Sequence, residues 1–418
     1  MYRKDTLANG IRVVSETLPK SRSVSIGVWV KVGSRHEPPE LGGVSHFIEH
    51  MFFKGTERRS AKDIAIEMDS LGGEMNAFTS QETTTFYAKV VDEHLPVVID
   101  ILADILLGSR FDPADMEKER KVILEEIKSV EDTPDDYIHE LFTGTVWPDN
   151  SLGRPILGIP ETIKALSHQS IISYIERYYL PKEIVISVAG NFEHNRLIEL
   201  LNTSFGKLSR TGVPKKDLTP GFTRATVVKK KQLEQVQICL GCGGLKYAHE
   251  DRFVLMALNT VLGNSMSSRL FQEIREQNAL AYSIYSYITS YRDTGLLTIY
   301  AGTDPSNALE VVRLVTRELK KIKDEGITQA EGLRVKNQIK GSLVLSLESS
   351  NSHMSRLARQ EIYFGKYHSM DDIIKSVEAV SLDQVQQLAQ RLFVPENLSL
   401  TILGPLSKDE VPDAVLEI

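Results

Sequence analysis

The two halves of the chain repeat one order of strands and helices, and this repeat limits the folds open to it. In each half a strand-like run leads into a helix, a second strand leads into a long helix, and a third strand follows a turn that contains proline. A repeat of this kind predicts an α+β chain of two homologous domains, each a largely antiparallel sheet with helices packed on one face. The matching strand-like runs are 24–30 with 236–240, 87–91 with 298–302, and 184–188 with 398–403.

The length of the chain also indicates two domains. At 418 residues it is too long for a single hydrophobic core, so two domains of about 200 residues each are expected. A polar stretch that contains Gly and Pro separates the halves. The predicted boundaries are 1–208 for the first domain, 209–223 for the linker and 224–418 for the second domain.

The most specific local pattern in the first half is His46-Phe47-Ile48-Glu49-His50, which reads H-x-x-E-H, the inverted order of a zinc-peptidase signature. Apolar residues at i, i+3, i+4 and i+7 from Val44 predict a helix here. On a helix the two histidines project from one side and are able to share a metal ion, with Glu49 beside it as a base for water. Two histidines alone are more often ordinary surface or core residues, so the metal interpretation requires a third ligand elsewhere.

A second helix, predicted to start at Asp112-Pro113, offers candidates for that ligand. Its apolar residues define one broad face, and Glu119 and Glu126 fall inside that face, about 20° apart, whereas Glu125 projects to the polar side. A carboxylate that faces a core is unfavourable unless a cation or hydrogen bonds compensate it. We therefore predict that Glu126 binds the metal and that Glu119 orients a histidine or tunes the water from the second shell of groups. The alternative is that both carboxylates lie at the edge of the face and reach water.

A family resemblance follows from these runs. His46-Phe47-Ile48-Glu49-His50-Met51, followed by Phe53-Lys54-Gly55-Thr56 and by the Glu119 and Glu126 pair, resembles the pitrilysin-type zinc metallopeptidases. The resemblance covers essentially the whole chain and points to the branch of the mitochondrial processing peptidase and its bacterial homologues. It implies one Zn²⁺ per chain, held by the two histidines and Glu126, with Glu49 as the catalytic base and Glu119 as a helper. It also implies two α+β domains, in agreement with the repeat.

The second half carries no such metal pattern, because its counterpart of the H-x-x-E-H helix, residues 253–262, has no His and no Glu. The run 267–283 resembles the second-domain signature of the same family. By that match, Arg275 and Tyr282 donate hydrogen bonds to the scissile carbonyl and to the oxyanion that develops on it. Without the resemblance, a surface arginine and an interfacial tyrosine are the simpler interpretation.

Residues 74–80 and 82–87 predict a strand, a turn and a second strand. In the resembled family the first of these strands is a sheet edge beside the zinc, and substrate backbone adds to it as an extra strand. The resemblance therefore makes Asn76, Ala77 and Phe53 substrate-binding residues. The alternative is an ordinary hairpin whose Asn is a polar residue near the turn.

Cys239 and Cys242 are the two cysteines of the chain and form a C-x-x-C pattern. Such a pair is able to act in redox chemistry or to bind a metal. The alternation around them predicts a strand, however, and residues three apart on a strand point to opposite faces. We interpret them as structural thiols in a reducing compartment.

The composition of the chain limits the classes of binding partner and the cellular compartments that are expected for it. The net charge of −7, without a basic block, argues against nucleic acid as a partner, and no apolar run is long enough to suggest a membrane span. The first ten residues lack the apolar region of a secretion signal and do not have the composition of a transit peptide. A cytoplasmic location in a bacterium is expected, in preference to a mitochondrial matrix.

Together these patterns predict a zinc-dependent endopeptidase that works through a metal-activated water. The resemblance implies that its substrates are unfolded peptides or small proteins. The resemblance implies a homodimer in which Arg275 and Tyr282 of one chain act on the zinc of the other. Two alternatives stay open: a non-catalytic core or regulatory subunit of the same fold, and a peptidase dedicated to one precursor. The intact His and Glu set weighs against the first, because such relatives usually lose part of it.

Overall fold

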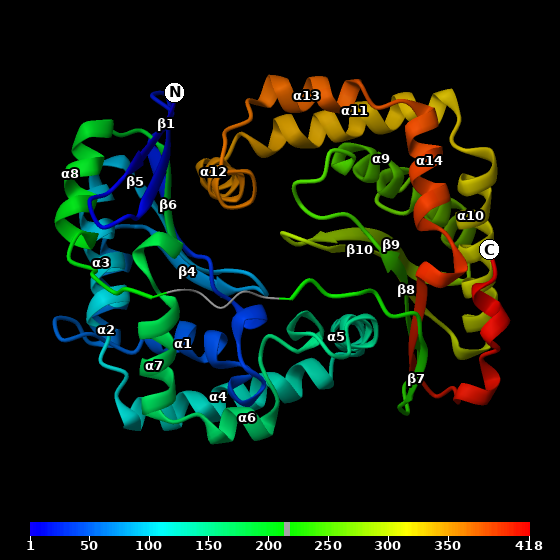
Figure 1. The fold of residues 1–418 in the computed structure, drawn as a ribbon, viewed down its shortest axis with the longest axis horizontal. Helices are drawn as coiled ribbons and strands as arrows, with labels where there is room; N and C mark the ends of the chain where they lie inside the picture. The colour runs from blue at the N-terminus through cyan, green and yellow to red at the C-terminus, as the bar shows by residue number, and fades with distance from the viewer. Residues whose placement is uncertain (213–217) are drawn as a thin grey trace. The chain divides into compact units, whose positions relative to one another are not determined.

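The computed structural model describes residues 1–212 and 218–418, which divide into two compact units (Figure 1). Of these residues, the first unit comprises 1–129, 154–212 and 346–367, and the second comprises 130–153, 218–345 and 368–418. Each unit therefore contains a segment from each half of the sequence.

A six-stranded sheet organises the first unit, in the order β1-β2-β6-β3-β5-β4. Neighbouring strands are antiparallel except β2 and β6, which run parallel. Strand β4 forms one edge of the described sheet, and its partner β5 leads back to the centre. The strands are β1 (Tyr2–Thr6), β2 (Arg12–Thr17), β3 (Ser23–Val30), β4 (Glu74–Thr79), β5 (Thr84–Val91) and β6 (Ile184–Gly190).

Seven helices contribute apolar side chains to one core on one face of this sheet. Ile26, Val28 and Phe86 point to that face from the central strands, and they share the core with Phe47 and Ile48 of helix α1. The helices are α1 (Val44–Phe52), α2 (Ala61–Ser70), α3 (Leu95–Gly108), α4 (Pro113–Glu131), α6 (Pro160–Ala165), α7 (His168–Tyr178) and α8 (His194–Phe205).

The opposite face of the first sheet is covered by α12 (Ser350–Phe364), a helix from the second half of the sequence. Val14, Trp29 and Val185 alternate along their strands with residues of the main core, so they point away from it. They are buried in a separate cluster with Met354 and Leu357 of α12. Both faces of the sheet are therefore packed.

A five-stranded sheet organises the second unit, in the order β7-β11-β8-β10-β9. Strands β7 and β11 are parallel and the other neighbours are antiparallel. The order matches the first sheet without one edge strand, as the sequence repeat predicts. The strands are β7 (Thr226–Lys230), β8 (Val236–Gly243), β9 (Ala281–Ser290), β10 (Gly295–Thr303) and β11 (Leu398–Gly404).

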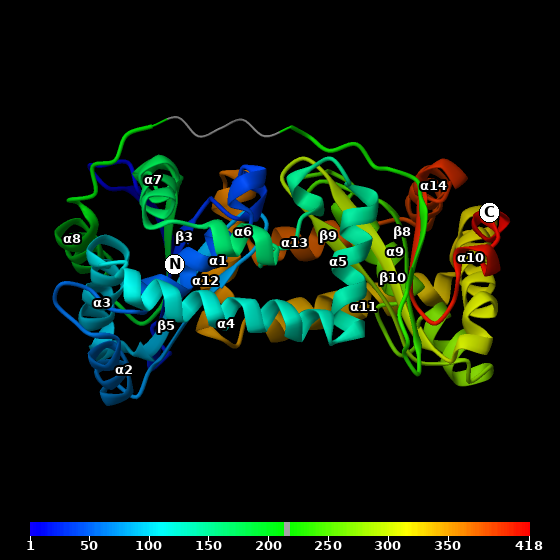
Figure 2. The ribbon, with the colours of Figure 1, turned by 90° about the horizontal axis from the view of Figure 1, so that it is seen from below.

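The second sheet is also covered on both faces (Figure 2). One face packs on helices that share the larger core of this unit. The other face packs on α5 (Pro134–Val146), a helix from the first half of the sequence, through Ile138 and Phe142. The helices of the larger core are α9 (Arg252–Leu262), α10 (Ala308–Glu325), α11 (Gln329–Ser346), α13 (Met370–Glu378) and α14 (Leu382–Leu392).

Helices α5 and α12 are thus exchanged between the two halves of the sequence. Each lies directly on a glycine of an inner strand. A Cβ atom on Gly27 of β3 would lie 2.5 Å from Sδ of Met354, and a Cβ atom on Gly241 of β8 would lie 2.7 Å from Cζ of Phe142. The missing side chains allow the exchanged helices to approach the sheets closely.

The predicted α+β class with two homologous domains is confirmed. The division of the chain differs from the predicted boundaries at 208 and 224, because 130–153 and 346–367 each belong to the unit of the other half. Of the predicted linker 209–223, residues 213–217 lie outside the described residues, and the remainder has no helix or strand.

The two cysteines point to opposite faces of β8, as the alternation predicts. Cys239 is buried in the cluster under α5, and Cys242 is buried in the larger core. Both are free thiols, and burial raises the pKa of each. High thiol pKa values and the opposite orientations are consistent with a structural role.

The close approach of α5 to Gly241 gives a stability prediction. A Cβ atom there would also lie 2.7 Å from the main-chain oxygen of Leu297, which is not free to move. Gly241→Ala is expected to lower the free energy of unfolding by about 1–3 kcal/mol, measured by urea denaturation. The control is Gly341→Ala in α11, where nothing lies within 4 Å of the new atom, and which is expected to raise stability by about 0.5–1 kcal/mol. Equal changes in the free energy of unfolding for the two variants would contradict the close packing of α5 on Gly241.

Candidate metal centre

Helix α1 forms where the apolar spacing predicts it, from Val44 to Phe52. Its buried residues include Val44, Phe47, Ile48 and Met51, the predicted stripe. Gly43 precedes the helix with a φ of +91°, a left-handed conformation that favours glycine. His46 and His50 project from the side that adjoins the buried stripe, so packing of the stripe fixes the direction in which both imidazoles point.

A buried carboxylate holds the start of α1. Glu37 accepts hydrogen bonds from the N–H groups of Gly43, at 2.7 Å, and Ser45, at 2.8 Å. Burial raises the pKa of Glu37 to about 7, although these hydrogen bonds oppose the rise. The two N–H groups would otherwise lack partners at the helix start, and the carboxylate also interacts favourably with the helix dipole. The sequence gives no local sign of this cap, because Glu37 lies six residues before Gly43.

Helix α4 supplies the two carboxylates predicted to accompany the histidines. Met116, Ile123 and Ile127 bury one side of it. Glu119 lies on that side and is buried, whereas the side chain of Glu126, one turn before the end of the helix, is 40% exposed. The two glutamates therefore have different surroundings, as their different predicted roles require.

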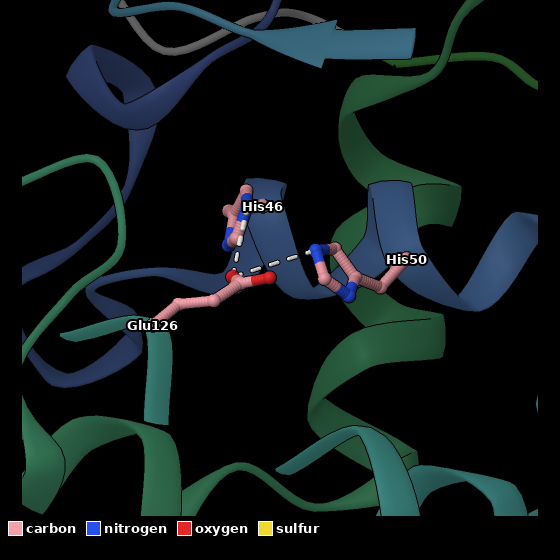
Figure 3. Close-up of side chains that lie close together, drawn as sticks. All are labelled: His46, His50 and Glu126. Carbon is pink, nitrogen blue, oxygen red and sulfur yellow. Dashed lines mark ion pairs between the residues drawn. The ribbon is translucent and has the colours of Figure 1, made fainter. Parts of the chain in front are cut away.

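The structure brings His46, His50 and Glu126 together (Figure 3). Oε2 of Glu126 lies 3.8 Å from Nε2 of His46 and 3.7 Å from Nε2 of His50. One ligand atom from each residue lies within 4.8 Å of the others, a group that suits a single metal ion. This is the predicted ligand set, reached from two helices that are some 70 residues apart in sequence.

Glu119 fixes the orientation of His50. Its Oε2 lies 3.0 Å from Nδ1 of His50, and its Oε1 lies 2.7 Å from Nζ of Lys54. A histidine held through Nδ1 by a carboxylate presents Nε2 to a metal in a defined direction. Lys54 compensates the charge that Glu119 brings into a buried position. Lys54 belongs to the run Phe53-Lys54-Gly55-Thr56, which by itself indicates no role for this side chain.

His46 lacks such a support. Its Nδ1 is buried and has no hydrogen-bond partner among residues 1–212 and 218–418. Burial, together with the neighbouring His50, lowers the pKa of His46 to about 3. The imidazole is therefore neutral at pH 7, which is the form that binds a metal.

Glu49 projects from the same helix toward the edge strand. Thr79, the last residue of β4, donates a hydrogen bond from Oγ1 to Oε2 of Glu49. Burial raises the pKa of Glu49, and the Thr79 hydroxyl and His50 oppose this rise. A carboxylate of raised pKa beside a metal site suits proton transfer near neutral pH. The contact with Thr79 was not predicted from the sequence.

The donor set fits zinc. Two imidazole nitrogens and one carboxylate oxygen from three side chains match the ligand types and number of catalytic zinc sites, which leave a position open for water. The unpartnered, neutral imidazole of His46 and the oriented imidazole of His50 both suit ligation. A group of three His, Cys, Asp or Glu side chains of this closeness occurs only here among the described residues.

The predicted substrate-binding residues lie beside the centre. Asn76 and Ala77 are on the edge strand β4, and the N–H of Ala77 donates to the side chain of Asn76 at 2.8 Å rather than to strand β5. That N–H therefore points to the free edge of the described sheet. Phe53 is half-buried at the end of α1, with its ring centroid 6.2 Å from that of Phe86. Its role in substrate binding stays a prediction.

Arg275 and Tyr282 lie together in the second unit. Cζ of Arg275 is 4.8 Å from the ring centroid of Tyr282 and 4.8 Å from that of Phe271. Arg275 belongs to a π-helical turn, Phe271–Gln277, and Tyr282 is 79% exposed at the start of β9. Tyr282 is exposed and Arg275 is partly exposed, and their role in binding an oxyanion stays a prediction.

Comparison with known proteins agrees with the geometry of this centre. The family model of insulinase (peptidase family M16) matches residues 12–159, and that of the peptidase M16 inactive domain matches residues 165–339. A zinc protease of Bacillus subtilis, described as uncharacterized, is 46% identical over 97% of this chain and 98% of its own length. The chain belongs to peptidase family M16. The predicted family is thereby confirmed.

Two solved structures have the same fold as this chain. A protease from Helicobacter pylori has a TM-score of 0.90 and 24% identity, and the match covers 97% of this chain and 99% of that one. A chain of complex III₂ from Candida albicans has a TM-score of 0.85 and 19% identity, and the match covers 100% of both chains. At these identities the likeness concerns the fold alone. Among the described residues, no helix is both long enough and apolar enough to cross a membrane.

The contact between Glu119 and His50 gives a prediction for metal affinity. Glu119→Gln keeps the size of the side chain but removes the charge that supports His50 and pairs with Lys54. The affinity for Zn²⁺ is expected to fall about 10- to 100-fold, measured by competition with a fluorescent chelator. Glu125→Gln, on the exposed side of the same helix, is the matched control and is expected to bind zinc as the wild type does. Equal affinities of the two variants for Zn²⁺ would contradict the role of Glu119 in supporting His50.

Proposed function

We propose that this M16 chain is a zinc-dependent endopeptidase that hydrolyses peptide bonds of unfolded peptides or small proteins. The observation that carries the proposal is the convergence of His46, His50 and Glu126, with Glu49 on the same helix as the histidines. Curated relatives named zinc proteases support the same reaction class. The proposal assigns one zinc ion to each chain.

In the proposed mechanism His46, His50 and Glu126 hold the zinc ion. When bound, zinc supplies Lewis acidity that polarises the scissile carbonyl and makes water more acidic. Glu49 takes a proton from the attacking water and later transfers it to the leaving amine. Glu119 keeps His50 in place through Nδ1, and Lys54 keeps Glu119 in place through its charge.

The edge strand β4 offers a means to bind substrates of varied sequence. A peptide that adds to this edge makes main-chain hydrogen bonds, which depend little on its side chains. Asn76 and Ala77 lie on this strand, and Phe53 lies at the end of α1. Only a peptide in an extended conformation is able to pair with the edge, so we propose flexible or unfolded chains as the substrate class.

Arg275 and Tyr282 complete the proposed mechanism by donating hydrogen bonds to the developing oxyanion. We propose that the protein is a homodimer and that this pair acts on the zinc site of the partner chain. The proposal rests on the family resemblance together with the exposure of Tyr282 and the contact between its ring and Arg275.

A peptidase assay tests the reaction. Purified protein with Zn²⁺ is expected to cleave a quenched fluorescent peptide, a chelator is expected to abolish cleavage, and added zinc to restore it. Glu49→Gln is expected to lower kcat/KM by at least about 100-fold, because it removes the base and keeps the zinc ligands. Glu57→Gln, an exposed residue that follows α1, is the control with unchanged activity.

Other outcomes of this assay favour the alternatives. A wild-type protein that binds no zinc and cleaves nothing would support a non-catalytic subunit of the same fold. If the protein is active, peptides from a cell lysate retained by Glu49→Gln report its substrate range. Many unrelated peptides support the proposed broad substrate class, and one retained precursor supports a dedicated processing peptidase.

Mixing two inactive variants tests the action across a dimer. Glu49→Gln lacks the base and keeps the Arg275 and Tyr282 pair, whereas Arg275→Ala lacks part of the pair and keeps the base. If the pair acts on the partner chain, the mixed dimer contains one complete site, and an equimolar mixture is expected to recover about a quarter of the wild-type activity. If the pair acts within its own chain, or if the protein is a monomer, no activity returns on mixing.

A further inference from the structure

We infer that Thr79 is a positioning residue for the carboxylate of Glu49, and that a clamp built on the turn after β4 holds Thr79 in place. The inference rests on the proposed function, because it assigns Glu49 the role of the base. It adds to that function a residue of the edge strand and a helix from the second half of the sequence.

The register of the sheet fixes the direction of Thr79. Thr79 pairs with Thr84 of β5, and Thr84 pairs with Val30 of β3. Met75 and Ala77, which point to the same side of β4 as Thr79, pack against the core that contains α1. The hydroxyl of Thr79 therefore faces α1 and donates to Oε2 of Glu49.

This contact decides how the base is presented. Glu49 is half-buried, so a carboxylate without a fixed donor would turn toward any donor that is available. A hydrogen bond from Thr79 to Oε2 selects one orientation and leaves Oε1 to accept a proton from water. Proton transfer requires the acceptor within hydrogen-bond distance of the attacking water, so orientation of Glu49 bears directly on the rate.

The turn after β4 is held by the main chain of a neighbouring loop. The N–H of Ser34 donates to the oxygen of Ser80 at 3.2 Å, and that of Arg35 donates to the oxygen of Gln81 at 2.8 Å. A Cβ atom on Gly33 would lie 2.1 Å from the oxygen of Ser80, so only glycine permits this approach. Because Thr79 directly precedes this turn, the loop limits the movement of its side chain.

Side chains complete the clamp. Nη1 of Arg35, which is fully buried, lies 2.8 Å from Oε1 of Glu82 in the same turn. The hydroxyl of Tyr363 donates to Oε2 of Glu82 at 2.9 Å. Tyr363 belongs to α12, the exchanged helix on the first sheet. The second half of the sequence thus contributes to the rigidity of the segment that orients the base.

A set of threonine variants tests the role of Thr79. Thr79→Val removes the hydroxyl and keeps the shape, and it is expected to lower kcat about 10- to 100-fold, with little change in KM, zinc content or Tm. Thr79→Ser keeps the hydroxyl and is expected to retain most of the activity. Thr85→Val is the matched control on the other face of the same hairpin, because the buried Thr85 hydroxyl has no partner among the described residues.

Tyr363 tests the clamp at a distance from the centre. Tyr363→Phe removes the hydroxyl that donates to Glu82 and is expected to lower kcat about two- to tenfold. Tyr367→Phe is the control, because the ring of Tyr367 stacks on Tyr2 and this contact survives the substitution. Equal kcat values for the two phenylalanine variants would overturn the clamp.

The position of the Glu49 carboxylate tests the role of Thr79 without any measurement of activity. It is to be compared in crystal structures of the metal-free wild type, Thr79→Val and Thr79→Ser. The Glu49 carboxylate is expected to leave β4 only in the valine variant. An unchanged carboxylate, or a valine variant as active as the wild type, would overturn the role of Thr79. A wild-type protein that cleaves nothing would contradict the proposed function, while the position of the carboxylate would still decide this inference.

Discussion

The structure around α1 is governed by the need to bury charged and ionisable groups with a partner for each. A carboxylate taken out of water is strongly unfavourable unless hydrogen bonds or a cation compensate it. Glu37 has two main-chain N–H donors, Glu119 has His50 and Lys54, and Glu49 has the hydroxyl of Thr79. Each of these partners also fixes a position or an angle of the helix or of its side chains. The compensation that makes burial possible thereby also makes the centre rigid.

His46 is the exception, because one of its buried polar atoms has no partner among the described residues. Its Nδ1 is buried without a partner among the described residues, and burial keeps the ring neutral. A neutral ring next to a second imidazole and a carboxylate is an arrangement in which a cation would lower the free energy of all three groups. We therefore regard binding of the metal as a contribution to local stability as well as to chemistry.

The residues that follow a helical period could be predicted from the sequence, and the structure brings them together. The stripe from Val44 to Met51 and the position of Glu119 within an apolar face both follow from about 100° per residue. The partners Glu37, Lys54 and Thr79 could not be predicted, because their contacts depend on how separate segments pack. The exchange of α5 and α12 was also missed. One indication of it lies in β6 and β11, in which every residue is buried. Strands of this kind require helices or strands packed on both faces of their sheet.

The exchange of helices bears on how a duplicated chain changes over evolution. The half without metal ligands supplies α12, and α12 covers an apolar face of the sheet that adjoins the metal-binding helix. Deletion of that half would expose Val14, Trp29 and Val185 to water, so the loss would be selected against even if the half had no chemistry of its own. The half without metal ligands is therefore needed for the fold around the metal centre, whatever its own chemistry.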